Sequence, residues 1–158
     1  MNVADLGSAP GSWTQIVRER LTDKNGELKG RIIAMDILPM EPIDGVTFLQ
    51  GDFREQEVAD KLNEILGGDK LDVVISDMAP NLSGIAMVDA NASLLLNELA
   101  LDFAVEHLKP EGVFVTKAFQ GSGYSQFIEN CKKHFVSVAQ RKPEASRNSS
   151  AEMYVVAR

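Results

Sequence analysis

The sequence has few of the residues that build metal and disulfide sites. It contains one cysteine, Cys131, and two histidines among its 158 residues. A single cysteine excludes an internal disulfide framework and a zinc site built from cysteines. His107 and His134 stand at no spacing typical of metal ligands, so we expect no metal site. Cys131 is expected to have only a structural role, as a small residue on a late helix.

Long apolar runs and an excess of positive charge are also missing. No run approaches the roughly 20 apolar residues of a membrane helix, and the N-terminus lacks a signal-peptide pattern, which predicts a cytoplasmic protein without a membrane partner. Lysine and arginine total 16 against 23 aspartates and glutamates, a net charge of −7. This charge argues against a generally basic surface for nucleic acid. With 44% hydrophobic residues and no repeat or linker, we expect one domain over residues 1–158.

A glycine-rich turn near the start of the chain is the most informative stretch. Val3–Leu6 is a short apolar run, Gly7 and Gly11 punctuate a turn, and the pattern becomes helical from Trp13. In open α/β sheets such a turn lets the backbone approach a ligand closely, although the spacing differs from the Gly-x-Gly-x-x-Gly of pyrophosphate binders. Asp5 at the strand end would repel a phosphate but suits a positively charged ligand such as S-adenosylmethionine. The alternative is an ordinary strand-to-helix turn.

Strands and helices are expected to alternate along the whole chain. Short apolar runs predict strands at 3–6, 31–35, 46–50, 71–75, 113–116, 135–139 and 153–157. Amphipathic stretches predict helices from residue 13 onward and over 54–66, 89–108 and 125–134, with Asp89 as the N-cap of the third. Ile16, Val17 and Leu21 are expected on one face of the first helix, and Leu95, Leu99 and Phe103 at helical spacing on the third. The order predicts an α/β fold, a mainly parallel sheet with helices on both faces.

Polar residues stand where the predicted strands end: Asp5, Asp36, Asp52, Asp77 and Lys117. Because ligands bind doubly wound sheets at the carboxyl ends of the strands, we expect these five residues to form one site. The position of Asp36 suits a carboxylate that accepts hydrogen bonds from ribose hydroxyls. Asp52 is placed to meet an adenine amino group.

The last strand is expected to complete this site. A short connection permits it to run antiparallel beside the strand of 113–116. Glu152, directly before the last strand, would then face Lys117, which would stand between the carboxylates of Asp77 and Glu152. A lysine in such a place is a candidate general base, and the alternative is a surface lysine that reaches into water.

Six short blocks together resemble a known family over essentially the whole chain. They are Asp5-Leu-Gly-Ser-Ala-Pro-Gly-Ser-Trp13, Asp36-Ile-Leu-Pro-Met40, Leu49-Gln-Gly-Asp-Phe53, Ser76-Asp-Met-Ala-Pro-Asn81, Lys117-Ala-Phe-Gln-Gly121 and Glu152-Met-Tyr-Val-Val156. In combination they resemble the FtsJ/RrmJ family of ribosomal RNA ribose 2′-O-methyltransferases. The resemblance implies a Rossmann-like, seven-stranded methyltransferase sheet with one antiparallel strand, S-adenosylmethionine as methyl donor, and a uridine of large-subunit ribosomal RNA as target.

The resemblance also implies roles for individual residues. The cofactor would be held by Gly11, Trp13, Asp36, Asp52 and Asp77. The family uses a Lys-Asp-Lys-Glu catalytic tetrad, of which Asp77, Lys117 and Glu152 match the last three members. Lys117 would be the base for the ribose 2′-hydroxyl, and the two acids would orient the lysines.

The first lysine of the tetrad has no counterpart in this sequence. In the family it lies upstream of the glycine turn, in a basic N-terminal segment that helps to bind RNA. We therefore expect that segment to be absent, and we expect this chain to bind the cofactor but to methylate RNA weakly at most. The basic residues that remain, Lys132, Lys133, Arg141, Lys142 and Arg147, could still contact phosphates.

Three other functions compete with this interpretation. A methyltransferase for amino groups or small molecules would use the same fold, but the turn Ser76–Pro80 lacks the Asn/Asp-Pro-Pro-aromatic pattern of amino methylation. A non-catalytic ribosome-assembly factor could retain the cofactor site. An NAD-dependent oxidoreductase is disfavoured by the missing Gly-x-Gly-x-x-Gly. We expect a monomer that acts on the large ribosomal subunit or its RNA.

Overall fold

The computed structural model describes residues 1–9, 11–78, 83–142 and 152–158. In these residues the chain forms strands β1 (Asn2–Leu6), β2 (Arg31–Asp36), β3 (Val46–Gln50), β4 (Leu71–Ser76), β5 (Leu108–Phe119), β6 (Val138–Arg141) and β7 (Glu152–Ala157). The helices are α1 (Ser12–Leu21), α2 (Gln56–Leu66), α3 (Ala86–His107) and α4 (Tyr124–Lys132). Strands and helices alternate as the apolar runs predicted.

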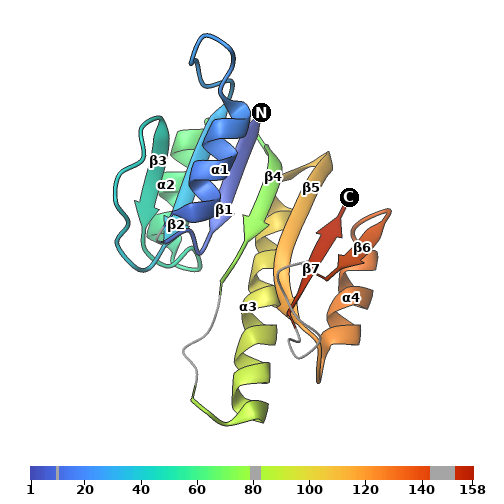
Figure 1. Cartoon of the computed structure of the whole chain (residues 1–158). Coiled ribbons are helices and arrows are strands. Elements are labelled where there is room, and N and C mark those ends of the chain that lie inside the picture. Colours follow the sequence, from blue (N-terminus) through green and yellow to red (C-terminus); the bar gives the residue numbers. More distant parts are fainter. Residues whose placement is uncertain (10, 79–82, 143–151) are drawn as a thin grey trace.

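The strands form one seven-stranded sheet in the order β3-β2-β1-β4-β5-β7-β6 (Figure 1). The pairs from β3 to β5 are parallel, whereas β7 is antiparallel to both β5 and β6. This confirms the predicted mainly parallel sheet with one antiparallel strand. Because parallel strands all end at the same edge, the residues that follow β1 to β5 are brought together there.

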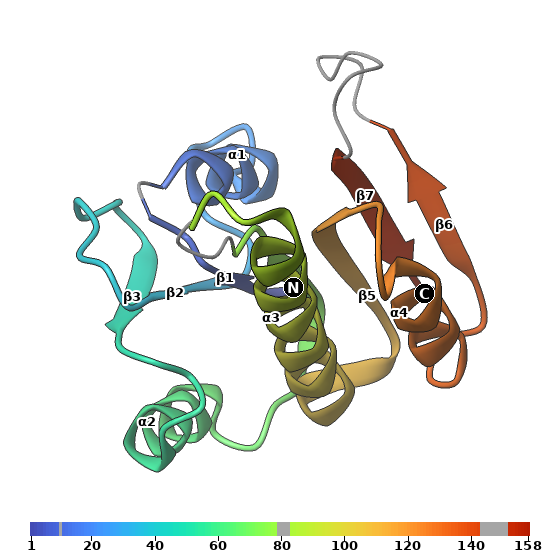
Figure 2. The same ribbon diagram turned by 90° about the horizontal axis from the view of Figure 1, so that it is seen from below.

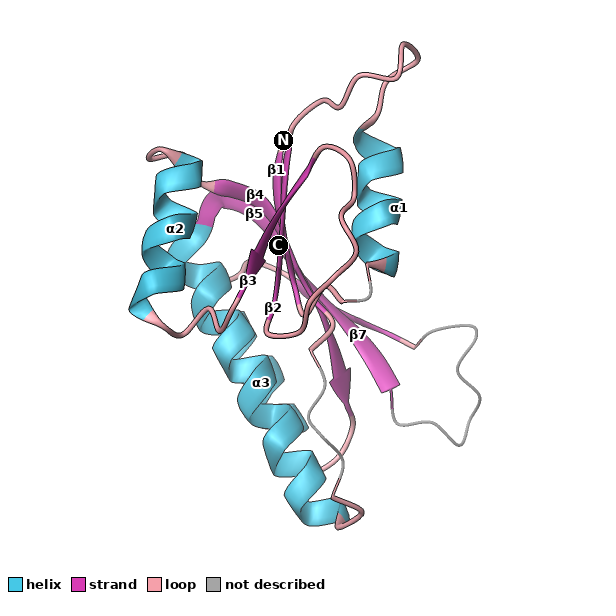
Figure 3. Cartoon of the chain, turned by 90° about the vertical axis from the view of Figure 1, so that its left-hand side faces the viewer, coloured by secondary structure: helices cyan, strands magenta, loops and turns pink. Residues whose placement is uncertain are grey.

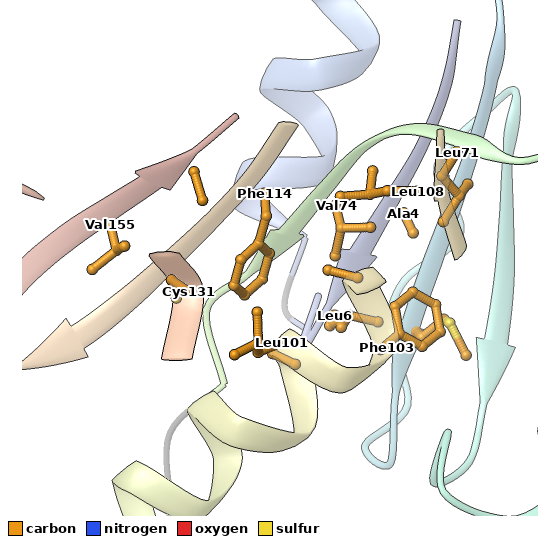
Figure 4. Packing of buried hydrophobic residues seen from close by; sticks show 14 of the residues in the cluster. Ala4, Leu6, Leu71, Val74, Leu101, Phe103, Leu108, Phe114, Cys131 and Val155 are labelled. Atoms are coloured by element: carbon orange, nitrogen blue, oxygen red, sulfur yellow. The ribbon is translucent and has the colours of Figure 1, made fainter. Parts of the chain in front are cut away.

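Helices cover the two faces of the sheet unequally. Helix α1 lies on one face, and α2, α3 and α4 lie on the other (Figure 2). The hydrophobic core is formed between the sheet and the second group of helices, where Leu101 and Phe103 of α3 pack among Leu6, Val74 and Phe114 of the strands (Figure 4). The alternation of apolar residues on β5 and β7 directs every second side chain into this core.

Several element boundaries in the second half of the chain differ from the prediction; β6, for example, spans Val138–Arg141 and not 135–139. Helix α3 begins at Ala86, so Asp89 is not its N-cap but lies in its first turn, where its carboxylate accepts hydrogen bonds from Ser83 N (2.8 Å) and Gly84 N (3.3 Å). Strand β5 spans Leu108–Phe119, beginning well before and ending after the predicted strand of 113–116, and includes Pro110-Glu-Gly112. An irregularity between the pairs of Leu71 and Val73 accommodates these residues, because the β4–β5 register shifts there.

Two apolar residues expected at helix interfaces are instead exposed. Ile16 on α1 is 53% exposed and Leu95 on α3 is 56% exposed. On α1 the buried residue is Thr14, which faces strand β1. Leu95 lies in the N-terminal half of α3, and Figure 3 shows that end of the helix reaching past the strands that it covers. Helical periodicity shows which residues share a face, but it does not show how far the sheet extends beneath that face.

Candidate functional site

A cavity of about 370 Å³ opens at the carboxyl edge of the sheet, beside strands β1, β2 and β4. Three of the predicted carboxylates, Asp36, Asp52 and Asp77, lie in its wall. The remaining lining is mostly apolar and includes side chains that the sequence analysis did not identify: Met35, Ile37, Leu38, Met78, Leu96 and Leu99. A cavity of this size with a few carboxylates in an apolar wall suits one small ligand that carries both apolar and positively charged parts.

The turn after β1 forms the inner wall of the cavity. The backbone amides of Gly7 and Ser8 donate hydrogen bonds to the Met35 carbonyl of β2, at 2.8 and 3.2 Å. Gly7 has a φ of +72°, and a Cβ atom there would lie 2.7 Å from Cγ of Met78. Glycine is therefore required both by the backbone conformation and by the close approach of the turn to the end of β4.

Asp5 lies directly behind this wall, 1% exposed within β1. The Thr14 hydroxyl donates a 2.6 Å hydrogen bond to its Oδ2 atom. Within the described residues, its Oδ1 atom and the nearby Ser8 Oγ are buried without a hydrogen-bond partner. Burial raises the pKa of Asp5 from 3.8 to about 6, the Thr14 hydrogen bond opposes this shift, and the carboxylates of Asp77 and Asp36 add to it. The site thus holds more negative charge than it neutralises by itself.

Asp36 at the end of β2 holds the rim of the cavity. Its Oδ2 atom accepts a 2.8 Å hydrogen bond from Ala9 N, and its Oδ1 atom accepts one of 2.9 Å from Leu38 N. This carboxylate therefore joins the first turn to the loop after β2. Its place at the strand end agrees with the predicted position of a ribose-binding acid.

Asp52, after β3, is paired with a residue that the sequence analysis assigned to a helix. Arg54 precedes α2 and folds back, so that its Nη2 atom lies 2.5 Å from Asp52 Oδ2. The hydrogen bonds from Arg54 lower the pKa of Asp52 despite its partial burial. Phe53 lies in the cavity wall and packs edge-on against Phe103. The spacing Asp-x-Arg was the available signal for the ion pair.

Asp77 and Lys117 meet at the point where the cavity adjoins β5. Lys117 Nζ lies 2.7 Å from Asp77 Oδ1, with side-chain exposures of 19% and 29% respectively. Asp77 directly follows β4 and Lys117 lies in the neighbouring parallel strand β5, where Ser76 is paired with Thr116. The sequence analysis thus correctly placed both residues at one edge. Their pair is partly buried but still reachable from solvent.

The register of β7 places Tyr154, and not Glu152, opposite Lys117. Glu152 is paired with Phe119 and is the first residue of β7, so the expectation that it faces Lys117 is wrong. Among the described residues, Asp77 alone lies within ion-pair distance of the Lys117 amine. Residues two apart on a strand share a face, so Glu152 still lies on the Lys117 side of the sheet. Tyr154 was missed because its proximity to Lys117 depends on this pairing.

Gly11 and Trp13 lie at the start of α1, outside the lining of the cavity. Gly11 has a φ of +122° and precedes the helix directly. The Trp13 ring packs against Tyr154 of β7, with 5.6 Å between ring centroids and 38° between planes. The structure therefore brings Trp13 to the Lys117 side of the site and not to the carboxylate cavity.

The described residues provide neither a metal site nor a membrane span. They contain no group of three or more histidine, cysteine, aspartate or glutamate side chains placed to hold a metal ion. None of their helices combines the length and the apolar character of a membrane span. Cys131 is buried in α4, and burial raises the pKa of its thiol to about 12. The candidate chemistry is thus concentrated at the carboxyl edge of the sheet.

Two solved methyltransferase structures are similar to this chain. A ribosomal RNA methyltransferase from Plasmodium falciparum superposes with a TM-score of 0.85 at 30% identity, covering 99% of this chain and 85% of that one. Human methyltransferase-like protein 13, solved with SAH, superposes with a TM-score of 0.69 at 16% identity, covering 100% of this chain and 71% of that one. The second likeness shows the fold alone.

Sequence comparison identifies closer relatives. A protein of Bordetella petrii named ribosomal RNA large subunit methyltransferase E is 55% identical over 156 residues, which are 99% of this chain and 74% of the relative. The protein of that name from Cupriavidus necator is 52% identical over 164 residues, with the same coverage of 99% and 74%. The family model described as FtsJ-like methyltransferase matches residues 1–158. The chain therefore belongs to the FtsJ-like methyltransferase family.

Proposed function

We propose that this protein transfers a methyl group from S-adenosylmethionine to the ribose 2′-hydroxyl of a uridine in large-subunit ribosomal RNA. The observation that carries the proposal is the Lys117–Asp77 pair, with 2.7 Å between Nζ and Oδ1, at the junction of the cavity and strand β5. The names of the relatives, which are more than 50% identical, support ribosomal RNA as the substrate. The likeness to the Plasmodium enzyme supports the same reaction class.

The residues of the cavity fit S-adenosylmethionine as the cofactor. This ligand carries an ammonium and a sulfonium, and the cavity is surrounded by carboxylates, including a buried Asp5 with one oxygen that lacks a hydrogen-bond donor among the described residues. Gly7 permits the close approach of the backbone. We assign cofactor binding to Gly7, Asp36, Asp52 and Asp77 in the cavity wall, with Asp5 behind it and Gly11 at the start of α1, whereas Trp13, which packs against Tyr154, belongs to the Lys117 side of the site.

In the proposed reaction Lys117 is the general base. When bound, S-adenosylmethionine supplies an electrophilic methyl group and a sulfur that leaves with the bonding electron pair. The Lys117 amine takes the proton of the 2′-hydroxyl as the ribose oxygen forms its bond to the methyl carbon. Asp77 orients Lys117 through their contact. The Glu152 carboxylate, on the same face of the sheet, helps to orient it. Much of the rate comes from holding the reactants in line.

We further propose that residues 1–158 are one domain that acts as a monomer on the large ribosomal subunit in the cytoplasm. A single core cluster draws residues from the first strand, Ala4 and Leu6, and from the last, Val155 and Ala157, which supports one domain. Sedimentation of the purified chain and its binding to isolated subunits test the oligomeric state and the partner.

The decisive experiment is transfer of labelled methyl from S-adenosylmethionine to undermethylated large ribosomal subunits. The RNA is then digested to identify the labelled nucleotide, and cofactor affinity is measured by calorimetry on the same sample. Label in a 2′-O-methylated uridine supports the proposal. Cofactor binding without transfer would support a non-catalytic, cofactor-binding assembly factor, and label in a base or in protein would contradict ribose as the acceptor.

A further inference from the structure

Three neighbouring strands present a row of one cation, one aromatic ring and a second cation. Lys117 of β5 is paired with Tyr154 of β7, and Tyr154 is paired with Arg141 of β6. Residues directly opposite one another on antiparallel strands lie on the same face of the sheet. Since neighbouring strands are about 4.8 Å apart, the row spans roughly 10 Å from Lys117, the proposed base, to Arg141.

The face that carries this row has partly exposed side chains along β5 and β7. Strand β5 alternates between buried residues, such as Phe114 and Thr116, and partly exposed ones, such as Val115 and Lys117. The buried set faces the core with α3, where the Thr116 hydroxyl meets Asn97. In the described part of the chain, α1 is the helix on the opposite face, and its Trp13 borders the row at Tyr154. Within the described residues, Lys117 and Tyr154 are partly exposed on this face and Arg141 is exposed.

The aromatic member of the row is uncharged at physiological pH. Burial raises the pKa of Tyr154 to about 12, and the carboxylates of Glu152 and Asp77 add to the shift. A neutral ring does not repel a polyanion. Arg141 is exposed at the end of β6, and no carboxylate of the described residues lies within ion-pair distance of its guanidinium.

These features match the two contacts by which proteins hold single-stranded RNA. Aromatic rings stack on nucleobases, and arginine binds phosphate. The carboxylate cavity on the other side of Asp77 would repel phosphates, and the whole chain has a net charge of −7. The row of Lys117, Tyr154 and Arg141 therefore presents, at the sheet edge, the cations and the aromatic ring that such contacts require.

We propose that Tyr154 and Arg141 are positioning residues for the RNA: the Tyr154 ring, bordered by Trp13, stacks on a nucleobase beside the methylated ribose, and Arg141 contacts a phosphate one strand further on. This inference rests on the proposed ribosomal RNA methyltransferase function. It adds to that function the path of the RNA, which leaves Lys117 across β7 toward β6.

The test compares three substitutions in the row with one control substitution of an arginine elsewhere. Tyr154→Leu removes the ring but suits a strand, Tyr154→Phe removes only the hydroxyl, and Arg141→Ala is matched by Arg20→Ala on the exposed surface of the last turn of α1. Dissociation constants for undermethylated large ribosomal subunits are measured by co-sedimentation at several salt concentrations. Calorimetry with S-adenosylmethionine on the same preparations reports whether the cofactor site is intact.

Loss of stacking in Tyr154→Leu is expected to weaken subunit binding by about 5- to 100-fold, with Tyr154→Phe close to the unsubstituted chain. Arg141→Ala is expected to reduce the slope of log K against log salt by about 1, and Arg20→Ala is expected to leave it unchanged. Cofactor affinity stays constant in all four variants.

Several results would overturn the inference while leaving the proposed function standing. They are wild-type subunit binding by Tyr154→Leu, an equal loss in Tyr154→Leu and Tyr154→Phe, equal salt slopes for the two arginine variants, or a parallel loss of cofactor affinity. Failure of the unsubstituted chain to bind subunits, in a sample that binds the cofactor, would overturn the proposed function and this inference together.

Discussion

Along the carboxyl edge of the sheet, β2 and β3 are followed or ended by the carboxylates Asp36 and Asp52, whereas β5 and β6 carry the cations Lys117 and Arg141. The first half encloses a cavity of about 370 Å³, and the second half is an open strand face. The two halves meet at Asp77, whose Oδ1 atom lies 2.7 Å from the Lys117 amine.

This difference follows from the opposite charges of the two proposed reactants. A sulfonium cofactor is stabilised by carboxylates, and an RNA strand is repelled by them. A protein with a net charge of −7 can hold both only when the two kinds of charge are kept apart and meet where the reaction occurs. Variants on either side of Asp77 test this division.

In the cationic half, replacing Lys117 should strongly reduce methyl transfer. Lys117→Met is expected to lower methyl transfer by about 10²- to 10⁴-fold, because the general base is lost, while cofactor affinity is retained. Lys109→Met is the matched control, since Lys109 lies on the same strand and pairs with Asp72 at 3.1 Å but at the opposite end of β5. Single-turnover transfer to ribosomal subunits is the measurement. Equal losses in both variants would remove the assignment of Lys117 as the base.

In the carboxylate half, the charge of Asp5 should lower the stability of the folded chain when no ligand is bound. Because burial raises the pKa of Asp5 from 3.8 to about 6, the folded chain holds a proton that the unfolded chain has released between these values. Stability is therefore lost as pH rises through this window, by up to about 3 kcal/mol above pH 6. Asp5→Asn removes this cost and keeps an acceptor for Thr14.

Urea unfolding of Asp5→Asn and the unsubstituted chain at pH 4 and pH 8 measures this effect. The variant is expected to be more stable at pH 8, with the difference mostly gone at pH 4. Its affinity for S-adenosylmethionine is expected to be lower, because one negative charge has been removed from the site. A stability difference that does not change with pH would show that Asp5 is not the titrating group.

Asp36 tests whether the rim of the cavity serves only the cofactor. Asp36→Asn is expected to weaken S-adenosylmethionine binding about 10-fold, because charge-assisted hydrogen bonds from Ala9 N and Leu38 N are weakened. The rate at saturating cofactor should be unchanged. Asp44→Asn is the control. Asp44 lies in the loop before β3 with a side chain that is 100% exposed, so this variant removes the same charge and should leave S-adenosylmethionine binding unchanged. A fall in the saturated rate would mean that Asp36 also acts in the reaction.

Gly7 tests the close approach of the first turn to β4. Gly7→Ala and Gly26→Ala both place a side chain at positive φ, +72° and +81°, but only Gly7 has neighbours within 4 Å. Both variants should lose about 1 kcal/mol of stability from the backbone, and Gly7→Ala should lose about 1 kcal/mol more from contact with Met78. Thermal unfolding of the pair measures the difference. Equal losses would show that the turn has room for a Cβ atom.

Local patterns in the sequence predicted much of the fold and the first half of the site. Apolar runs and glycine turns identified the strands, and the rule that ligands bind at the carboxyl ends of parallel strands placed Asp36, Asp52 and Asp77 together. These inferences succeed because they depend on neighbours in the chain and on one general property of parallel sheets. The same reasoning paired Asp77 with Lys117 before the fold was known.

The second half of the site was decided by tertiary structure. The sequence indicated an antiparallel last strand, but its register placed Tyr154 opposite Lys117 and moved Glu152 two pairs further along, opposite Phe119. The extent of β5 beyond its apolar run and the exposure of Ile16 likewise depended on which strands and helices lie alongside. Strand register depends on packing between segments distant in sequence, and a shift of one residue reverses every side chain, so no local pattern determines it.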